Sequence, residues 1–169
     1  FGSSILSTLT GSLPSILMSC GRAPDGTPVA EHGWLQVDGT KLCNEAGQPI
    51  RLRGVSLFWS QWMPQYWNLS VVRWLRDDWR VSLVRAAMGV EHGGYLENPD
   101  TEMDRVQAVV DAAIQVGIYV IIDWHDHCAN KHAREARHFF SILAMKYHDC
   151  PNIMFETFNE PEMQNWATE

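Results

Sequence analysis

The sequence predicts an α/β fold that comprises about the first four strands of an eight-stranded (β/α)8, or TIM, barrel. Apolar segments of strand length alternate with helical patterns, and the connections are too long for hairpins, which favours a parallel sheet. A complete barrel takes roughly 250 residues, whereas this chain has 169. A free-standing doubly wound sheet is the alternative fold, although no glycine-rich phosphate turn follows the first predicted strand.

The first 32 residues are predicted to be a leader followed by a linker. Residues 4–20 are mildly apolar, but Gly11 and Pro14 interrupt them and no positively charged segment precedes them. They are either the remains of a signal peptide or an unprocessed leader, and they are too short and polar to span a membrane. Residues 21–31 are rich in glycine and proline, which is typical of a linker. Residues 33–169 are then the N-terminal half of the barrel, truncated after strand four.

Turn signals and hydrophobic periodicity divide the remaining chain into elements. Asp38-Gly39 predicts a hairpin between residues 34–37 and 40–43. Strands are predicted at residues 50–57, 81–87, 118–124 and 152–158, and helices at 70–78, 99–117 and 131–148. In the second helix, Asp100 or Thr101 can cap the start and Gly117 can end it.

Composition and charge narrow the classes of ligand. The net charge is −7 and no basic run occurs, which argues against nucleic acid and anionic membranes as partners. The chain contains eight tryptophans, and residues 58–67 hold three of them together with a tyrosine and a phenylalanine. Such a loop at a strand end offers flat apolar surfaces, which suit a neutral ligand such as a glucan.

The four cysteines, Cys20, Cys43, Cys128 and Cys150, form no C-x-x-C motif, so their spacing indicates neither a zinc site nor a thioredoxin-type redox site. Three pairings are possible in an oxidising compartment. Cys43 and Cys150 are expected near the N-terminal side of the barrel and are our predicted pair, which leaves Cys128 free. Asn68-Leu69-Ser70 is a sequon for N-glycosylation.

Polar residues gather where the predicted strands end. The fourth strand delivers Asn159 and Glu160 directly before Pro161, and the C-terminal ends of barrel strands are where such folds keep catalytic residues. Arg85 lies within an apolar strand and therefore needs a carboxylate partner. That partner is either Asp123 or Glu156 in a structural ion pair, or an active-site carboxylate that Arg85 orients.

The third strand ends in Asp123, Trp124, His125, Asp126 and His127. Histidines two residues apart at a strand tip usually diverge, and the pattern offers no obvious third ligand, so we predict no metal site. His125 is expected to hydrogen-bond sugar hydroxyls instead.

The ordered motifs L-R-G-V-S-L-F-W-S-Q-W, V-R-A-A-M, G-G-Y, Y-V-I-I-D-W-H-D-H and F-N-E-P resemble glycoside hydrolase family five. The nearest resemblance is to its subfamily two of endo-β-1,4-glucanases, known from bacteria, plant-parasitic nematodes and beetles, and it runs from about residue 33 to the end of the chain. The resemblance implies a secreted, monomeric barrel enzyme that hydrolyses β-1,4-glucan with retention and needs no cofactor.

The resemblance also assigns roles to residues. Glu160 matches the general acid/base, and Asn159 the residue that binds the sugar 2-hydroxyl. Arg85 matches the arginine that contacts the nucleophile, and His125 matches a sugar-binding histidine. Trp62 matches a stacking residue, and we add Trp59 to it. The family's nucleophile is a glutamate at the end of strand seven, for which Glu162 and Glu169 lie too close in sequence to Glu160. We therefore expect this fragment alone to be inactive. Mannan, xylan or xyloglucan as substrate, or a non-catalytic carbohydrate-binding protein, are the alternatives.

Overall fold

The computed structural model describes residues 20–165 and 167, and within them a parallel sheet of four strands forms the centre of the fold. The strands are β3 (Gly54–Ser56), β4 (Leu83–Gly89), β5 (Tyr119–His125) and β6 (Ile153–Glu156), hydrogen-bonded in the order β3-β4-β5-β6. Sheet order follows chain order, as it does in a barrel, and this confirms the predicted front half of an α/β barrel.

A helix follows each of the first three strands of this sheet. These helices are α2 (Leu69–Asp78), α3 (Pro99–Val116) and α4 (Ala133–Lys146), with short 3-10 turns η1 (Pro64–Tyr66) and η2 (Ala129–His132) before α2 and α4. All three predicted helices are confirmed, although the one predicted at 131–148 is divided between η2 and α4. Gly117 ends α3 in the left-handed region at φ 75°, as predicted. The predicted cap was wrong, because Asn98 occupies that position and Asp100 lies in the first turn.

The two faces of the sheet differ because side chains alternate along each strand. Val84, Ala86 and Met88 of β4 belong to the main apolar cluster, together with side chains from all three helices. The helices therefore cover this face. The opposite face presents the alternate residues of β4 and β5, among them Arg85 and Asp123, and it is the face on which the candidate site lies.

Trp79 follows the last turn of α2 and does not join the buried stripe of that helix. It is the C-cap of α2 and is 58% exposed, whereas Val72 and Leu75 are buried. The periodic pattern places a residue on an angular stripe, but at the last turn the chain leaves the helix and the stripe no longer applies.

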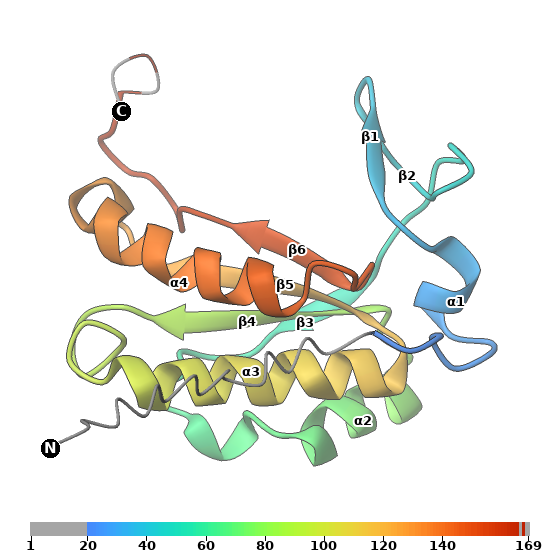
Figure 1. The fold of residues 1–169 in the computed structure, drawn as a ribbon, viewed down its shortest axis with the longest axis horizontal. Coiled ribbons are helices and arrows are strands. Elements are labelled where there is room, and N and C mark those ends of the chain that lie inside the picture. Colours follow the sequence, from blue (N-terminus) through green and yellow to red (C-terminus); the bar gives the residue numbers. More distant parts are fainter. Residues whose placement is uncertain (1–19, 166, 168–169) are drawn as a thin grey trace, which may run out of the picture.

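A hairpin and a short helix lie beyond the end of the sheet where the strands begin (Figure 1). The antiparallel hairpin joins β1 (Gln36–Asp38) and β2 (Lys41–Cys43), as predicted, but its turn lies at Gly39 and Thr40, one residue later than the predicted Asp38-Gly39. Part of the predicted linker is helical instead: α1 (Pro28–His32) is capped by the Thr27 side chain. The Val29 amide donates to the Gly117 carbonyl, which ties α1 to the loop before β5. Residues 1–19, the predicted leader, lie outside the described residues.

The disulfide joins Cys20 to Cys150, so the predicted Cys43–Cys150 pair was wrong. The two Cα atoms are 5.3 Å apart, within the range that a disulfide spans. Cys43 is a buried free thiol at the end of the hairpin, and Cys128 is free, as predicted. Within the described part of the chain, no helix is both long enough and apolar enough to cross a membrane.

Candidate functional site

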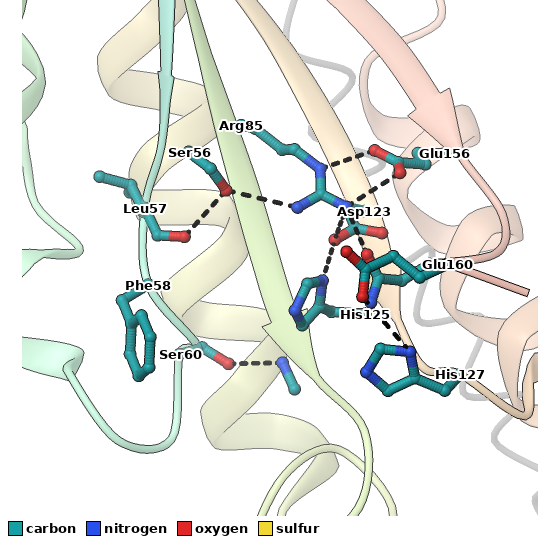
Figure 2. Close-up of polar contacts among 12 residues, drawn as sticks. Ser56, Leu57, Phe58, Ser60, Arg85, Asp123, His125, His127, Glu156 and Glu160 are labelled. Atoms are coloured by element: carbon teal, nitrogen blue, oxygen red, sulfur yellow. Dashed lines mark hydrogen bonds and ion pairs between the residues drawn. The ribbon is translucent and has the colours of Figure 1, made fainter. Parts of the chain in front are cut away.

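The candidate site is built on the open face of the sheet, where β4, β5 and β6 approach their C-terminal ends (Figure 2). The register pairs Asp123 of β5 with Glu156 of β6, and Gly89 of β4 with His125 of β5. Arg85 lies one strand across from Asp123, so its long side chain can reach both carboxylates. The four predicted polar residues Arg85, His125, Asn159 and Glu160 are thereby brought to one edge.

Arg85 is the hub of this cluster. Its Nε and Nη2 donate to the two oxygens of Glu156 at 2.7 and 2.9 Å. Nη2 also lies 2.9 Å from Asp123 Oδ2 and donates to Asn159 Oδ1 at 2.9 Å. The sequence had left the partner open between Asp123 and Glu156, and the structure pairs Arg85 with both. Burial lowers the pKa of Arg85, but the hydrogen bond to Glu156 and the surrounding carboxylates outweigh it and raise the pKa overall.

Asp123 links the arginine to the histidine. Its side chain is fully buried, and Oδ2 lies 2.6 Å from His125 Nδ1. Burial raises the pKa of Asp123 against the opposing effects of His125 and Arg85. When Asp123 is ionised its oxygen can only accept, so Nδ1 carries the hydrogen and Nε2 remains the free ring nitrogen. This arrangement fixes both the ring orientation and the tautomer of His125.

Asn159 and Glu160 follow β6 and differ in burial. Asn159 is buried, and no described residue accepts a hydrogen bond from its Nδ2, while its oxygen is held by Arg85. Glu160 is 76% exposed at its side chain, and its Oε2 lies 3.7 Å from His127 Nδ1. Its φ of 46° is a left-handed value that a residue with a Cβ rarely adopts. The Glu160 carboxyl group lies beside His127 at the edge of the polar cluster (Figure 2).

The aromatic loop at residues 58–62 lies beside the polar cluster, at the end of β3. The Trp59 ring meets the His125 ring edge-on, with centroids 4.2 Å apart, and stacks on Trp62 at 4.8 Å. Phe58 lies 6.2 Å from Trp62. Trp62 is half exposed, and its stacking contact with Trp59 connects it to the site.

Hydrogen bonds hold this loop in place. The Ser60 amide donates to the Ala87 carbonyl at 3.3 Å, and the Ser60 hydroxyl accepts from the Gly89 amide at 2.9 Å (Figure 2). The Trp67 indole donates to the Phe58 carbonyl at 3.0 Å. The loop is therefore attached to the end of β4, next to the polar cluster.

Sequence reasoning missed several members of this cluster. Ser56, Ser60 and Asp126 were assigned no role, and Glu156 was considered only as a structural partner. Asp126 accepts from the Cys128 amide at 2.8 Å and lies 2.7 Å from His132 Nδ1, so it fixes the loop after β5. For Glu156 the strand alternation was a usable signal, because it places Glu156 on the same face as Asp123.

The histidines of this loop do not form a metal cluster. The rings of His125 and His127 are 6.3 Å apart, and among the described residues no group of three or more histidine, cysteine, aspartate or glutamate side chains could hold a metal ion. What the arrangement offers chemically is an exposed carboxyl group beside oriented hydrogen-bond donors and a stacked aromatic surface. Such a set can bind a sugar and transfer a proton to it.

A family model described as Cellulase (glycosyl hydrolase family 5) matches residues 43–169. Among curated relatives, an endoglucanase of Clostridium saccharobutylicum is 38% identical over 141 residues, which is 81% of this chain and 32% of that protein. Endoglucanase Z of Dickeya dadantii is 43% identical over 138 residues, 79% of this chain and 32% of the relative. The chain thus spans about a third of the length of these relatives.

Several solved structures share the fold of this chain. A structure from Cytophaga hutchinsonii is 54% identical and covers 85% of this chain and 47% of its own, with a TM-score of 0.83. The catalytic domain of the Thermobifida fusca endoglucanase Cel5A (E5) is 36% identical and covers 84% of this chain and 48% of its own, with a TM-score of 0.81. A variant of that enzyme has been solved in complex with cellotetraose.

Proposed function

This chain belongs to the cellulase family, glycosyl hydrolase family 5, and we propose that the protein carrying it is an endo-β-1,4-glucanase that retains anomeric configuration. One observation carries the proposal: Arg85, His125, Asn159 and Glu160 meet at the C-terminal edge of a parallel sheet, against the stacked Trp59 and Trp62. The C-terminal ends of the strands are where barrel enzymes hold their catalytic residues, and a carboxyl group at that position suits glycoside hydrolysis.

Glu160 is the proposed general acid/base. Its carboxyl group is exposed beyond the end of β6, and it lies 3.7 Å from His127. As an acid it protonates the glycosidic oxygen while the bond to the anomeric carbon breaks. It then removes a proton from the water that attacks the glycosyl-enzyme.

The nucleophile is proposed to lie outside these 169 residues. Two other carboxylates face this edge, but Asp123 is held by Arg85 and His125, and Glu156 by a two-point contact with Arg85. Neither is free to attack a sugar. Retention needs a second carboxylate roughly 5 Å from Glu160, to form the covalent intermediate. The 169-residue chain alone is therefore proposed to be inactive.

The remaining groups are proposed to bind the sugar. The Nδ2 of Asn159 is buried and has no acceptor among the described residues, so it can donate to a hydroxyl beside the cleavage point. The free Nε2 of His125 can bond a second hydroxyl, while Trp62 and Trp59 stack on sugar rings. Proton transfer and glycosyl transfer both use carboxyl groups here, so the proposal needs no cofactor.

The proposed substrate is β-1,4-glucan. The relatives named endoglucanase and the cellotetraose complex of a similar enzyme support this choice. The protein is proposed to act as a monomer.

The test is hydrolysis of carboxymethyl-cellulose and cello-oligosaccharides by the full-length protein, with a Glu160→Gln variant as the control. We expect turnover by the wild type and a loss of at least a thousandfold in Glu160→Gln, with cello-oligosaccharide binding retained. Equal turnover by both proteins would refute the role of Glu160. Parallel assays on mannan, xylan and xyloglucan decide the substrate, and binding of glucan without turnover by the wild type would favour a non-catalytic protein.

We also propose that the protein is secreted. The Cys20–Cys150 disulfide supports this, because such bonds persist in oxidising compartments and are rare in reducing ones. Free thiols at both positions in protein taken from its native source would contradict the proposal.

A further inference from the structure

His127 is a histidine at the C-terminal edge of the sheet to which the proposed mechanism gives no role. Its Nδ1 lies 3.7 Å from Oε2 of Glu160, the proposed acid/base (Figure 2). The side chain is partly exposed, but Nδ1 itself is buried and forms no hydrogen bond with a described residue. A buried polar atom without a partner is costly, and the Glu160 carboxyl group is the acceptor nearest at hand.

Local contacts fix the position of the His127 ring. The Asp126 carboxylate accepts from the Cys128 amide at 2.8 Å, across His127. The His127 carbonyl accepts from Gln164 Nε2 at 3.0 Å, which joins the loop after β5 to the segment that follows the proposed acid/base. The ring lies beside Trp59, with centroids 6.1 Å apart. Since the imidazole is held in place, the gap to the carboxyl group closes by rotation of the exposed glutamate side chain.

The other titratable and charged groups around this contact have partners of their own. They come from β4 and the loop after it, from β5 and the loop after it, and from β6. The pairs are Arg85 with Glu156 and Asp123, His125 with Asp123, and His132 with Asp126 and Glu91. Among the described residues, the ion-pair contact of Glu160 is with His127.

A donor at Nδ1 suits an acid that must release its proton. A distance of 3.7 Å is too long for a hydrogen bond, but such bonds in active sites are often long without substrate and tighten when it binds. A hydrogen bond donated to a carboxyl group favours the ionised form, and it is roughly twice as strong to a charged oxygen as to a neutral one. The contact therefore gains strength as the proton leaves Glu160, which is the stage at which a catalyst needs it.

We propose that His127 is a positioning residue for the acid/base: its Nδ1–H donates to Oε2 of Glu160, so that Oε1 carries the proton to the glycosidic oxygen. The inference rests on the proposed function, because it assumes that Glu160 is the acid. His127 keeps its own hydrogen throughout. The proton that Glu160 gives to the leaving group is replaced from the attacking water, as in the proposed mechanism.

The test compares His127→Phe and His127→Asn in the full-length protein. Phenylalanine keeps a ring beside Trp59 but has no donor, whereas asparagine loses the ring and can place its Nδ2 where Nδ1 stood. We expect kcat on cello-oligosaccharides to fall on the order of tenfold in His127→Phe, with KM within about threefold of the wild type. Asparagine should restore kcat to within about threefold of the wild type. Loss of kcat in His127→Asn but not in His127→Phe would show that the ring acts by packing and would overturn the inference.

The pH profile of kcat separates this role from a purely structural one. Its alkaline limb reports the acid, and its acidic limb reports the nucleophile. Losing a donor disfavours an ionised carboxyl group, so the alkaline limb should move to higher pH by about half to one unit in His127→Phe, while the acidic limb stays. The matched control is His138→Phe, at an exposed position of α4, which should move neither limb. An alkaline limb that stays in place or moves down in His127→Phe contradicts the proposed donor.

A second measurement needs no activity and separates this inference from the proposed function. The ring-nitrogen resonances of His127 in nuclear magnetic resonance spectra, identified by their loss in His127→Asn, show which nitrogen carries the hydrogen. We expect a protonated Nδ1 at the pH of the assay and a shift of its resonance in Glu160→Ala, which removes the acceptor. Both results in a protein that hydrolyses no glucan would sustain the contact and refute the function. An unprotonated Nδ1, or one that does not respond to Glu160→Ala, would refute the inference whatever the activity.

Discussion

The Cys20–Cys150 disulfide should be the largest single contributor to stability at the N-terminal end of the sheet, and replacing either cysteine by serine tests this. The two residues are 130 positions apart. The loop-entropy relation gives about 5 kcal/mol for a closed loop of that length, and native disulfides usually contribute about 2–5 kcal/mol. A domain of this size loses about 2–4 °C of melting temperature for each kcal/mol, so we expect a fall of about 5–20 °C.

The pairing itself can be read by peptide mapping. Trypsin cleaves after lysine and arginine, so an unreduced digest should link the peptide that ends at Arg22 to the one that begins at Tyr147. The Cys43–Cys150 pairing would instead link residues 42–51 to the Tyr147 peptide. The two alternatives differ in mass and cannot be confused.

The stability measurement is urea unfolding of the wild type, Cys20→Ser, Cys150→Ser and the double variant, with and without reductant. All three variants should show the same reduced free energy of unfolding. Reductant should lower the free energy of unfolding of the wild type to that value and leave the variants unchanged. Cys128→Ser is the control and should unfold as the wild type does, since that thiol is free. If reductant destabilised Cys20→Ser as much as the wild type, this bond would not be the source of the effect.

Three further outcomes are expected. Arg85→Lys should lower kcat/KM of the full-length protein at least a hundredfold, because an ammonium group cannot hold Glu156 at two points and reach Asn159 as well. Full activity in this variant would contradict the proposed role of Arg85 in holding these residues. Asn68→Ala should reduce the free energy of unfolding by about 1 kcal/mol in urea titrations, since the Asn68 side chain caps α2. Burial raises the pKa of Glu102 above 4.5, so the folded state binds more protons than the unfolded chain just above that pH. The stability contributed by Glu102 should fall as pH rises through that window, and Glu102→Gln should unfold with a flatter pH profile.

The succession of strands and helices could be predicted from the sequence, because each of these elements has its own local hydrophobic pattern. Buried parallel strands read as continuous apolar runs, and the helices between them repeat with the helical period. The segment at 21–31 shows where that reasoning stops. A five-residue helix such as α1 is too short to show a period, and a bond from Val29 to Gly117 helps to hold it in place. The partner of Cys150 was also misjudged, because a bond between residues 130 positions apart depends on the tertiary fold and leaves no local pattern in the sequence.

Glu102 lies in the first turn of α3, where the helix dipole favours an acidic residue. The sequence did contain the signal that it is buried. Glu102 precedes Val106 by four positions and Val109 by seven, which is the spacing of the apolar stripe. A carboxylate on that stripe must find a partner inside. Its partner is Arg105, three positions later on the same helix, and a pairing at that spacing can be predicted from the sequence.

The geometry around Arg85 also indicates where a second carboxylate would bind. A guanidinium has five N–H donors. Glu156, Asn159 and Asp123 occupy Nε and Nη2, whereas the contact of Nη1 is to Ser56 Oγ at 3.4 Å, the longest in the set. Nη1 therefore retains donor capacity on the side of Arg85 that faces Ser56, away from Glu156. Under the proposed mechanism, the nucleophile could use that donor without displacing Asp123 or Glu156. Arg85 would then hold the nucleophile ionised while Asn159, fixed by the same side chain, binds the sugar.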